Sequence, residues 1–200
     1  MTFPESEVSE IATSVLAVKS RPVVVGIDGP DGSGKSTLAR DLADYLCVPV
    51  AIVHGDDFYS DMSEKDRTLL SPEGGYEDYF DWRRLQSEVL ESIRSGAKDL
   101  RYQRFDWNAA RMGSWIELPV PEVVIVEGVY MLRPQLRGLL DYAVYVRASE
   151  ETTWGRLMAR GENPDEWIRK WIAAYSFYSS HVKPWRNADL VVEGEGRELR

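Results

Sequence analysis

A glycine-rich segment at residues 29–36 limits what this chain can fold into more than any other feature. It has the sequence Gly-Pro-Asp-Gly-Ser-Gly-Lys-Ser, a complete G-x-x-x-x-G-K-[ST] phosphate-binding loop. The apolar run Val23–Ile27 before it has the length and β-branched content of a buried strand, and Leu38, Leu42 and Leu46 after it recur at helical spacing. Strand, glycine-rich turn and helix is the order that the motif requires, so the sequence predicts a polyphosphate site.

The residue types in this loop suit a nucleoside triphosphate and its metal ion. The glycines let the backbone turn sharply and aim its N–H groups at phosphate oxygens. Lys35 can reach the β- and γ-phosphates, and the Ser36 hydroxyl can ligate Mg²⁺. The predicted cofactors are therefore ATP and Mg²⁺. The predicted nucleotide-binding residues are Gly29, Pro30, Asp31, Gly32, Ser33, Gly34, Lys35, Ser36 and Thr37.

Composition and charge exclude several classes of partner. The 44% apolar and 28% charged content is that of an ordinary globular protein. A net charge of -9 argues against a nucleic-acid or anionic-membrane surface, and Cys47, the single cysteine, allows no disulfide within the chain. The acidic N-terminus lacks a secretory apolar core, and the apolar runs are too short to span a bilayer. We expect a cytoplasmic protein with a small-molecule partner and no nucleic-acid or membrane partner. The sequence leaves open whether the protein forms a homo-oligomer.

Strand and helix patterns alternate along the chain. Four further apolar runs predict strands at Val50–His54, Val123–Val126, Tyr142–Val146 and Leu190–Val192. Helical patterns occupy residues 5–19, 81–94, 131–140, 149–160 and 164–180, the last with Asn163 as its cap residue. The polar segment 60–78 has the composition of a loop, and no element is assigned to the aromatic segment 100–121.

This alternation is typical of a parallel sheet covered by helices. We predict an α/β chain with the three-layer P-loop NTPase fold, in which a parallel five-stranded sheet has helices on both faces and a small helical lid. We expect one domain over residues 1–200, with an N-terminal helix in residues 1–20 and the lid at about residues 150–165.

Acidic residues follow two of the predicted strands, at the edge where parallel sheets bind ligands. Glu127 can hold Mg²⁺ opposite Ser36, and one of Asp56 and Asp57 can orient the hydroxyl that receives a phosphoryl group. Alternatively, Glu127 is a solvated strand end, and the aspartates begin a loop or cap a helix.

Three further groups are candidates. Arg156 and Arg160 lie on one face of a predicted helix and can close over the phosphates, although a solvated helix face has the same pattern. Trp107 lies in an aromatic segment that suits a ring-containing acceptor or core packing. His54 and His181 are isolated in the sequence, and we interpret both as structural.

The order of these motifs resembles the uridine kinase family, within a wider group of P-loop kinases that includes phosphoribulokinase and pantothenate kinase. The resemblance extends from about Val23 to Val192. Besides the loop, the matching segments are Asp56-Asp57-Phe58-Tyr59, Tyr79-Phe80-Asp81-Trp82, Phe105-Asp106-Trp107, Glu127-Gly128-Val129-Tyr130 and Leu132-Arg133-Pro134.

The resemblance implies an enzyme that transfers the γ-phosphoryl group of ATP to a hydroxyl of a small molecule, a nucleoside such as uridine or cytidine. It assigns Asp56 to the acceptor hydroxyl, Asp81 to the ribose hydroxyls, and Lys35, Arg156 and Arg160 to the transferred phosphate. The substrate-binding residues that it implies are Asp57, Tyr59, Asp81, Phe105, Asp106 and Trp107.

Two departures from the family leave the acceptor open. Asp31 stands where family loops usually carry Gly, Ser or Ala, and the sequence Gly-Pro-Asp-Gly-Ser-Gly-Lys-Ser also looks like a thymidylate kinase loop. The lid segment 161–164 is short. A sugar, a vitamin precursor or a nucleoside monophosphate is the alternative acceptor, although the acidic residues argue against a monophosphate. A regulatory ATP-binding module without an acceptor is the alternative from another class. The chain lacks the Asn-Lys-x-Asp motif of a GTPase switch.

Overall fold

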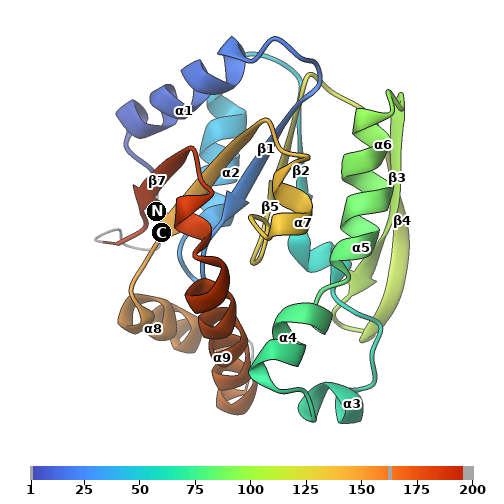
Figure 1. Ribbon diagram of the computed structural model, residues 1–200, viewed down its shortest axis with the longest axis vertical. Helices are drawn as coiled ribbons and strands as arrows, with labels where there is room; N and C mark the ends of the chain where they lie inside the picture. Colours follow the sequence, from blue (N-terminus) through green and yellow to red (C-terminus); the bar gives the residue numbers. More distant parts are fainter. Residues whose placement is uncertain (1, 162–163, 196–200) are drawn as a thin grey trace.

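The computed structural model describes residues 2–161 and 164–195, and a five-stranded parallel sheet forms its centre (Figure 1). Its order is β2-β5-β1-β6-β7, and each neighbouring pair is parallel. The strands are β1 (Val23–Asp28), β2 (Val50–His54), β5 (Val123–Glu127), β6 (Tyr142–Arg147) and β7 (Leu190–Glu193). The predicted five-stranded parallel sheet is confirmed, because every strand lies within one residue of its predicted bounds.

Helices cover both faces of this sheet. Alternate residues of β1, among them Val23 and Val25, pack in one apolar core with side chains of α1 (Glu5–Ala17) and α2 (Lys35–Tyr45). Val24, between them, joins a second core on the other face. That core includes α7 (Pro134–Arg137) and one continuous helix made of α5 (Trp82–Arg84), a π-helical stretch (Leu85–Leu90) and α6 (Glu91–Arg94). Because both faces are buried, the strands are continuous apolar runs.

Some elements differ from the sequence prediction. The segment 60–78 is not a loop: it contains α3 (Glu64–Thr68) and α4 (Pro72–Asp78), each started by a serine cap, Ser63 or Ser71. Of the helix predicted at 131–140, only the short α7 forms, since Pro134 fits the first turn of a helix but not its interior. The unassigned segment 100–121 forms an antiparallel hairpin of β3 (Asp99–Asp106) and β4 (Arg111–Pro119).

The carboxyl ends of the strands face a group of helices. In Figure 1, α3, α4, α8 (Glu150–Arg160) and α9 (Asp165–Val182) lie below the sheet, and α4 packs against α9. A short 3-10 turn, Pro184–Arg186, leads from α9 to β7. The predicted lid corresponds to α8 and the start of α9; its residues 162–163, including the predicted cap residue Asn163, lie outside the described part of the chain.

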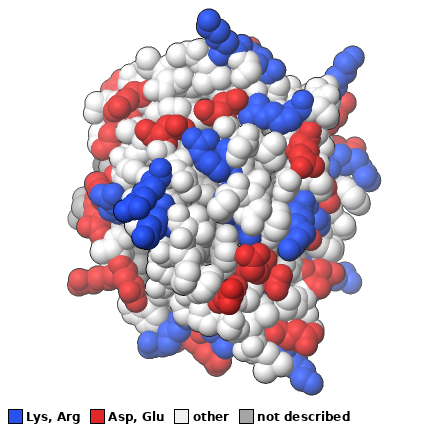
Figure 2. All heavy atoms as spheres, in the orientation of Figure 1, with Lys and Arg blue, Asp and Glu red and all other residues white. Residues whose placement is uncertain are grey.

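The outer surface carries both signs of charge. On the face in Figure 2, lysines and arginines alternate with aspartates and glutamates. Within residues 2–161 and 164–195, no helix has the length and apolar character needed to cross a bilayer.

Candidate active site

The phosphate-binding loop joins β1 to α2 and borders a cavity of about 130 Å³. Gly32 and Gly34 have φ angles of 75° and 105°, which only glycine adopts without strain. The first residue of α2 is Lys35, so the positive end of the helix dipole lies at this cavity. Lys35 is 7% exposed, and its Nζ donates to the Pro30 carbonyl at 2.9 Å. The loop therefore holds a cation and a helix N-terminus where a polyphosphate would bind.

A hydroxyl and a carboxylate meet at the far side of this cavity. The Ser36 Oγ lies 3.2 Å from both carboxylate oxygens of Glu127, at the end of β5. His54, at the end of the neighbouring strand β2, places its Nδ1 2.6 Å from Glu127, and this hydrogen bond raises the pKa of His54. His54, which we interpret as structural from the sequence, thus contacts the carboxylate expected to hold Mg²⁺. Its position in register with Glu127 was not visible in the sequence.

These oxygen ligands fit a hard cation such as Mg²⁺. In the described part of the chain, no three His, Cys, Asp or Glu side chains surround one metal position. Ser36 and Glu127 would thus hold the ion jointly with nucleotide and water oxygens, as a P-loop site does.

Asp56 and Asp57 follow β2 in a short 3-10 turn, Gly55–Phe58, and point to different partners. Asp56 borders the phosphate-loop cavity and also a second, larger one. Burial raises the pKa of Asp56 to about 7, and the carboxylates of Asp31 and Glu127 act in the same direction. Asp57 instead accepts a hydrogen bond from the Tyr102 hydroxyl at 3.3 Å and borders neither cavity. Of these two aspartates, Asp56 is thus the one that borders both cavities.

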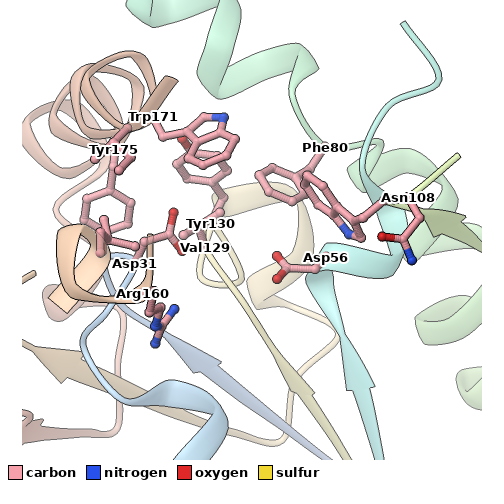
Figure 3. Close-up of a pocket in the computed structure, with 12 residues that line it drawn as sticks. Asp31, Asp56, Phe80, Asn108, Val129, Tyr130, Arg160, Trp171 and Tyr175 are labelled. Carbon is pink, nitrogen blue, oxygen red and sulfur yellow. The ribbon is translucent and has the colours of Figure 1, made fainter. Parts of the chain in front are cut away.

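The larger cavity, named the aromatic cavity from here on, has a volume of about 490 Å³, and five of its lining residues are aromatic (Figure 3). Asp31, Asp56 and Arg160 form its polar end, beside the phosphate loop. The remaining lining residues are Phe80, Trp107, Asn108, Val129, Tyr130, Leu157, Ile168, Trp171 and Tyr175. Such a space fits a flat ring with a polar group directed at Asp56.

Tyr130 has an unusual backbone conformation in this wall. Its φ angle is 65°, in the left-handed region, which costs a non-glycine residue about 1–2 kcal/mol. Its ring packs against Tyr76, Tyr175 and Tyr178 at centroid distances of 5.3, 5.9 and 5.0 Å. This packing holds the strained residue in the cavity wall.

The two candidate arginines of α8 lie in different environments. Arg160 borders both cavities. Arg156 is 8% exposed and donates to the carbonyls of Gly32 at 2.8 Å and Gly194 at 2.9 Å. The structure therefore brings Arg160, and not Arg156, to the cavities, while Arg156 links the phosphate loop to the residue after β7.

Several other predicted site residues line neither of these two cavities. The Asp81 Oδ1 accepts the N–H of Arg84 at 3.2 Å as the cap of α5, and Asp106 accepts the N–H groups of Asn108 and Ala109 at 3.0 Å. Tyr59 and Phe105 are buried and pack against each other, with ring centroids 5.3 Å apart. Trp107, whose ring is tilted against that of Tyr59 at a centroid distance of 4.4 Å, is the predicted aromatic residue that lines the cavity.

Two contributions were missed in the sequence. Ile168, Trp171 and Tyr175 share one face of α9, but this spacing is also that of a core helix. Asp28, the last residue of β1, is fully buried and accepts hydrogen bonds from Gly29 N at 2.6 Å, Leu132 N at 2.8 Å and the Tyr178 hydroxyl at 2.6 Å. Burial raises the pKa of Asp28 to about 6. Asp28 thus links the phosphate loop to α9.

Comparisons with known proteins agree with this geometry. A family model described as an AAA domain matches residues 25–170. Uridine kinase from Clostridium perfringens is 31% identical over 175 residues, covering 84% of this chain and 80% of the relative. Uridine kinase from Limosilactobacillus reuteri is 30% identical over 189 residues, covering 88% of this chain and 85% of the relative. The solved structure of a possible uridine kinase from Bacillus stearothermophilus superposes with a TM-score of 0.76 at 22% identity, covering 93% and 97% of the two chains.

The structural match shows the three-layer fold, and the sequence matches extend over most of this chain. The protein is an enzyme that transfers phosphoryl groups, and it belongs to the uridine kinase family of P-loop kinases.

Proposed function

We propose that this kinase transfers the γ-phosphoryl group of ATP to a hydroxyl of a nucleoside, uridine or cytidine, in the presence of Mg²⁺. The observation that carries the proposal is the position of Asp56, which borders both the phosphate-loop cavity and the aromatic cavity. A group at that junction can touch an acceptor hydroxyl in one cavity while the donor phosphate lies in the other. A protein that binds ATP and no acceptor would not need an aspartate between two cavities.

In the proposed reaction, the acceptor oxygen forms a bond to the γ-phosphorus, and the bond from that phosphorus to the β–γ bridging oxygen breaks. Asp56 orients the hydroxyl and accepts its proton, which its raised pKa favours. Lys35 and Arg160 neutralise the charge on the transferred group. Ser36 and Glu127 would hold Mg²⁺, and the bound ion would supply charge neutralisation at the phosphate oxygens.

The aromatic walls support a ring-containing acceptor over an open-chain polyol. Trp107 and Tyr130 offer flat faces on which a base can stack. The relatives named uridine kinase support a pyrimidine nucleoside. We further propose that residues 1–200 act as one kinase domain, and that α8 and the start of α9 are its lid.

The test is ADP release from ATP and Mg²⁺ with a panel of acceptors. The panel contains uridine, cytidine, sugars, vitamin precursors and nucleoside monophosphates. Lys35→Ala and Asp56→Asn are compared with Asp44→Asn, because Asp44 is an exposed residue of α2 outside both cavities. We expect release to rise with uridine or cytidine, to fall in the first two variants and to be unchanged in the control.

If no acceptor raises ADP release above the acceptor-free rate, the proposed function is wrong and an ATP-binding regulatory module is favoured. If a sugar is the best acceptor, the kinase assignment holds and the nucleoside assignment fails.

A further inference from the structure

Asp31 is a residue of the phosphate loop that borders the aromatic cavity, where we propose that the acceptor binds. It borders both the phosphate-loop cavity and the aromatic cavity. In Figure 3, the carboxylates of Asp31 and Asp56 point toward one another from opposite walls. An acceptor hydroxyl at Asp56 would therefore have Asp31 on its other side.

The contacts of Asp31 leave its carboxylate available to a ligand. The side chain is 40% exposed, and its Oδ1 lies 3.8 Å from the Lys35 Nζ, which is too far for a hydrogen bond. Lys35 directs a proton at the Pro30 carbonyl instead. In the described part of the chain, no closer ion pair of Asp31 is found.

A carboxylate at this place is costly unless a donor faces it. Asp31, Asp56 and Glu127 all border the phosphate-loop cavity, where a triphosphate adds further negative charge. Like charges that line one partly buried cavity destabilise one another, and the carboxylates of Asp31 and Glu127 both act to raise the pKa of Asp56. A hydrogen-bond donor on the acceptor would offset this repulsion, since hydrogen bonds to charged groups are the stronger ones.

The other acidic candidate is engaged elsewhere. The family resemblance assigns the acceptor's ribose hydroxyls to Asp81, but the Asp81 side chain caps α5 by accepting the Arg84 N–H at 3.2 Å. Asp81 is also absent from the lining of the aromatic cavity, in which Asp31 and Asp56 are the acidic residues of the described chain.

We propose that Asp31 determines acceptor specificity by accepting a hydrogen bond from a second hydroxyl of the acceptor, next to the one that Asp56 orients. This inference rests on the proposed function and adds a selection rule to it. An acceptor without that second hydroxyl gives the Asp31 carboxylate no hydrogen-bond donor to offset its repulsion by the phosphates. Such an acceptor therefore reacts more slowly.

The test compares uridine with 2′-deoxyuridine and 3′-deoxyuridine in the wild-type enzyme and in Asp31→Ala. In the wild type, we expect removal of one of the two hydroxyls to lower kcat/KM about 10- to 100-fold, the range of a lost hydrogen bond to a charged group. In Asp31→Ala, kcat/KM for uridine falls by a similar factor, and the penalty for the deoxy analogue disappears.

Three further measurements separate this role from a structural one. The KM for ATP is expected not to rise in Asp31→Ala, because a negative charge has left the phosphate site. Asp31→Ser, which carries a residue type usual in the family's loops, serves if the alanine variant folds poorly. Asp44→Asn, which removes an equivalent exposed charge, is expected to keep the full deoxy penalty.

An active Asp31→Ala enzyme that retains the wild-type deoxy penalty would overturn this inference and leave the proposed function standing. A wild-type enzyme that phosphorylates no nucleoside would overturn both.

Discussion

The buried contact between Asp28 and Tyr178 allows a quantitative test of how the phosphate loop is supported. The Tyr178 hydroxyl donates to the Asp28 Oδ2 at 2.6 Å, and both side chains are fully buried. Tyr178→Phe removes this donor and retains the ring packing. A hydrogen bond to a charged group contributes about 1.5–3 kcal/mol, so we expect a loss of that size when Asp28 is ionised.

The loss depends on pH with a defined sign. Burial raises the pKa of Asp28 from its usual 3.8 to about 6, so the folded protein binds a proton more tightly than the unfolded chain. The stability that this proton contributes is fully present below pH 3.8 and is lost as the pH rises through 6. Near pH 8.5 the carboxylate is ionised and Tyr178→Phe has its full effect. Near pH 5 Asp28 is mostly protonated, and the loss falls to about 0.5–1.5 kcal/mol.

Urea unfolding followed by tryptophan fluorescence measures both values. In a chain of this size, the loss at pH 8.5 corresponds to a decrease in Tm of about 3–12 °C. Tyr45→Phe, at a tyrosine that is 41% exposed, is the matched control and is expected to change stability by less than about 0.5 kcal/mol. A loss below about 0.5 kcal/mol at pH 8.5, or one that grows toward pH 5, would refute the reasoning.

Three further predictions concern the site. Asp56→Asn is expected to lower kcat about 10²- to 10⁴-fold in steady-state assays, and wild-type activity is expected to decline as the pH falls below about 7, where Asp56 takes up a proton. Arg156→Ala is expected to destabilise the fold by about 3 kcal/mol in urea unfolding, because it removes the buried guanidinium that donates hydrogen bonds to the carbonyls of Gly32 and Gly194. Arg160→Ala instead lowers kcat about 10²-fold with little change in stability, and the reverse pattern would contradict the two placements. Glu127→Gln is expected to raise the Mg²⁺ concentration for half-maximal activity at least tenfold and to lower the pKa of His54 in an NMR titration, because the carboxylate that holds both is lost.

The sequence was sufficient to predict the five strands of the sheet and the acidic residues at its carboxyl edge. The central strands β1 and β5 are buried on both faces and therefore appear as apolar runs without alternation. The ends of parallel strands meet at one edge, so Asp56 and Glu127 could be placed near the loop before the strand order was known. The residue register that sets His54 opposite Glu127 depends on β2 pairing with β5, which no local pattern encodes.

The environment of Arg156 depends on contacts between distant segments. Arg156 and Arg160 lie on one face of the same helix and look alike in the sequence. Arg156 is buried because α8 packs against the phosphate loop and Gly194. In the hairpin, a register shift between Gln103 and Phe105 breaks the alternation that would have indicated a strand.

The placement of α9 joins these observations. One face of this helix lines the aromatic cavity with Trp171 and Tyr175, and the Tyr178 hydroxyl one turn later holds Asp28 at the start of the phosphate loop. Asp28 and Tyr178 are 150 residues apart in the sequence. One wall of the aromatic cavity and a support of the phosphate loop are therefore parts of one helix. We therefore expect a substitution that shifts α9 to change the proposed acceptor binding and ATP binding together, and a change at Trp107, next to the separate hairpin, to change acceptor binding alone.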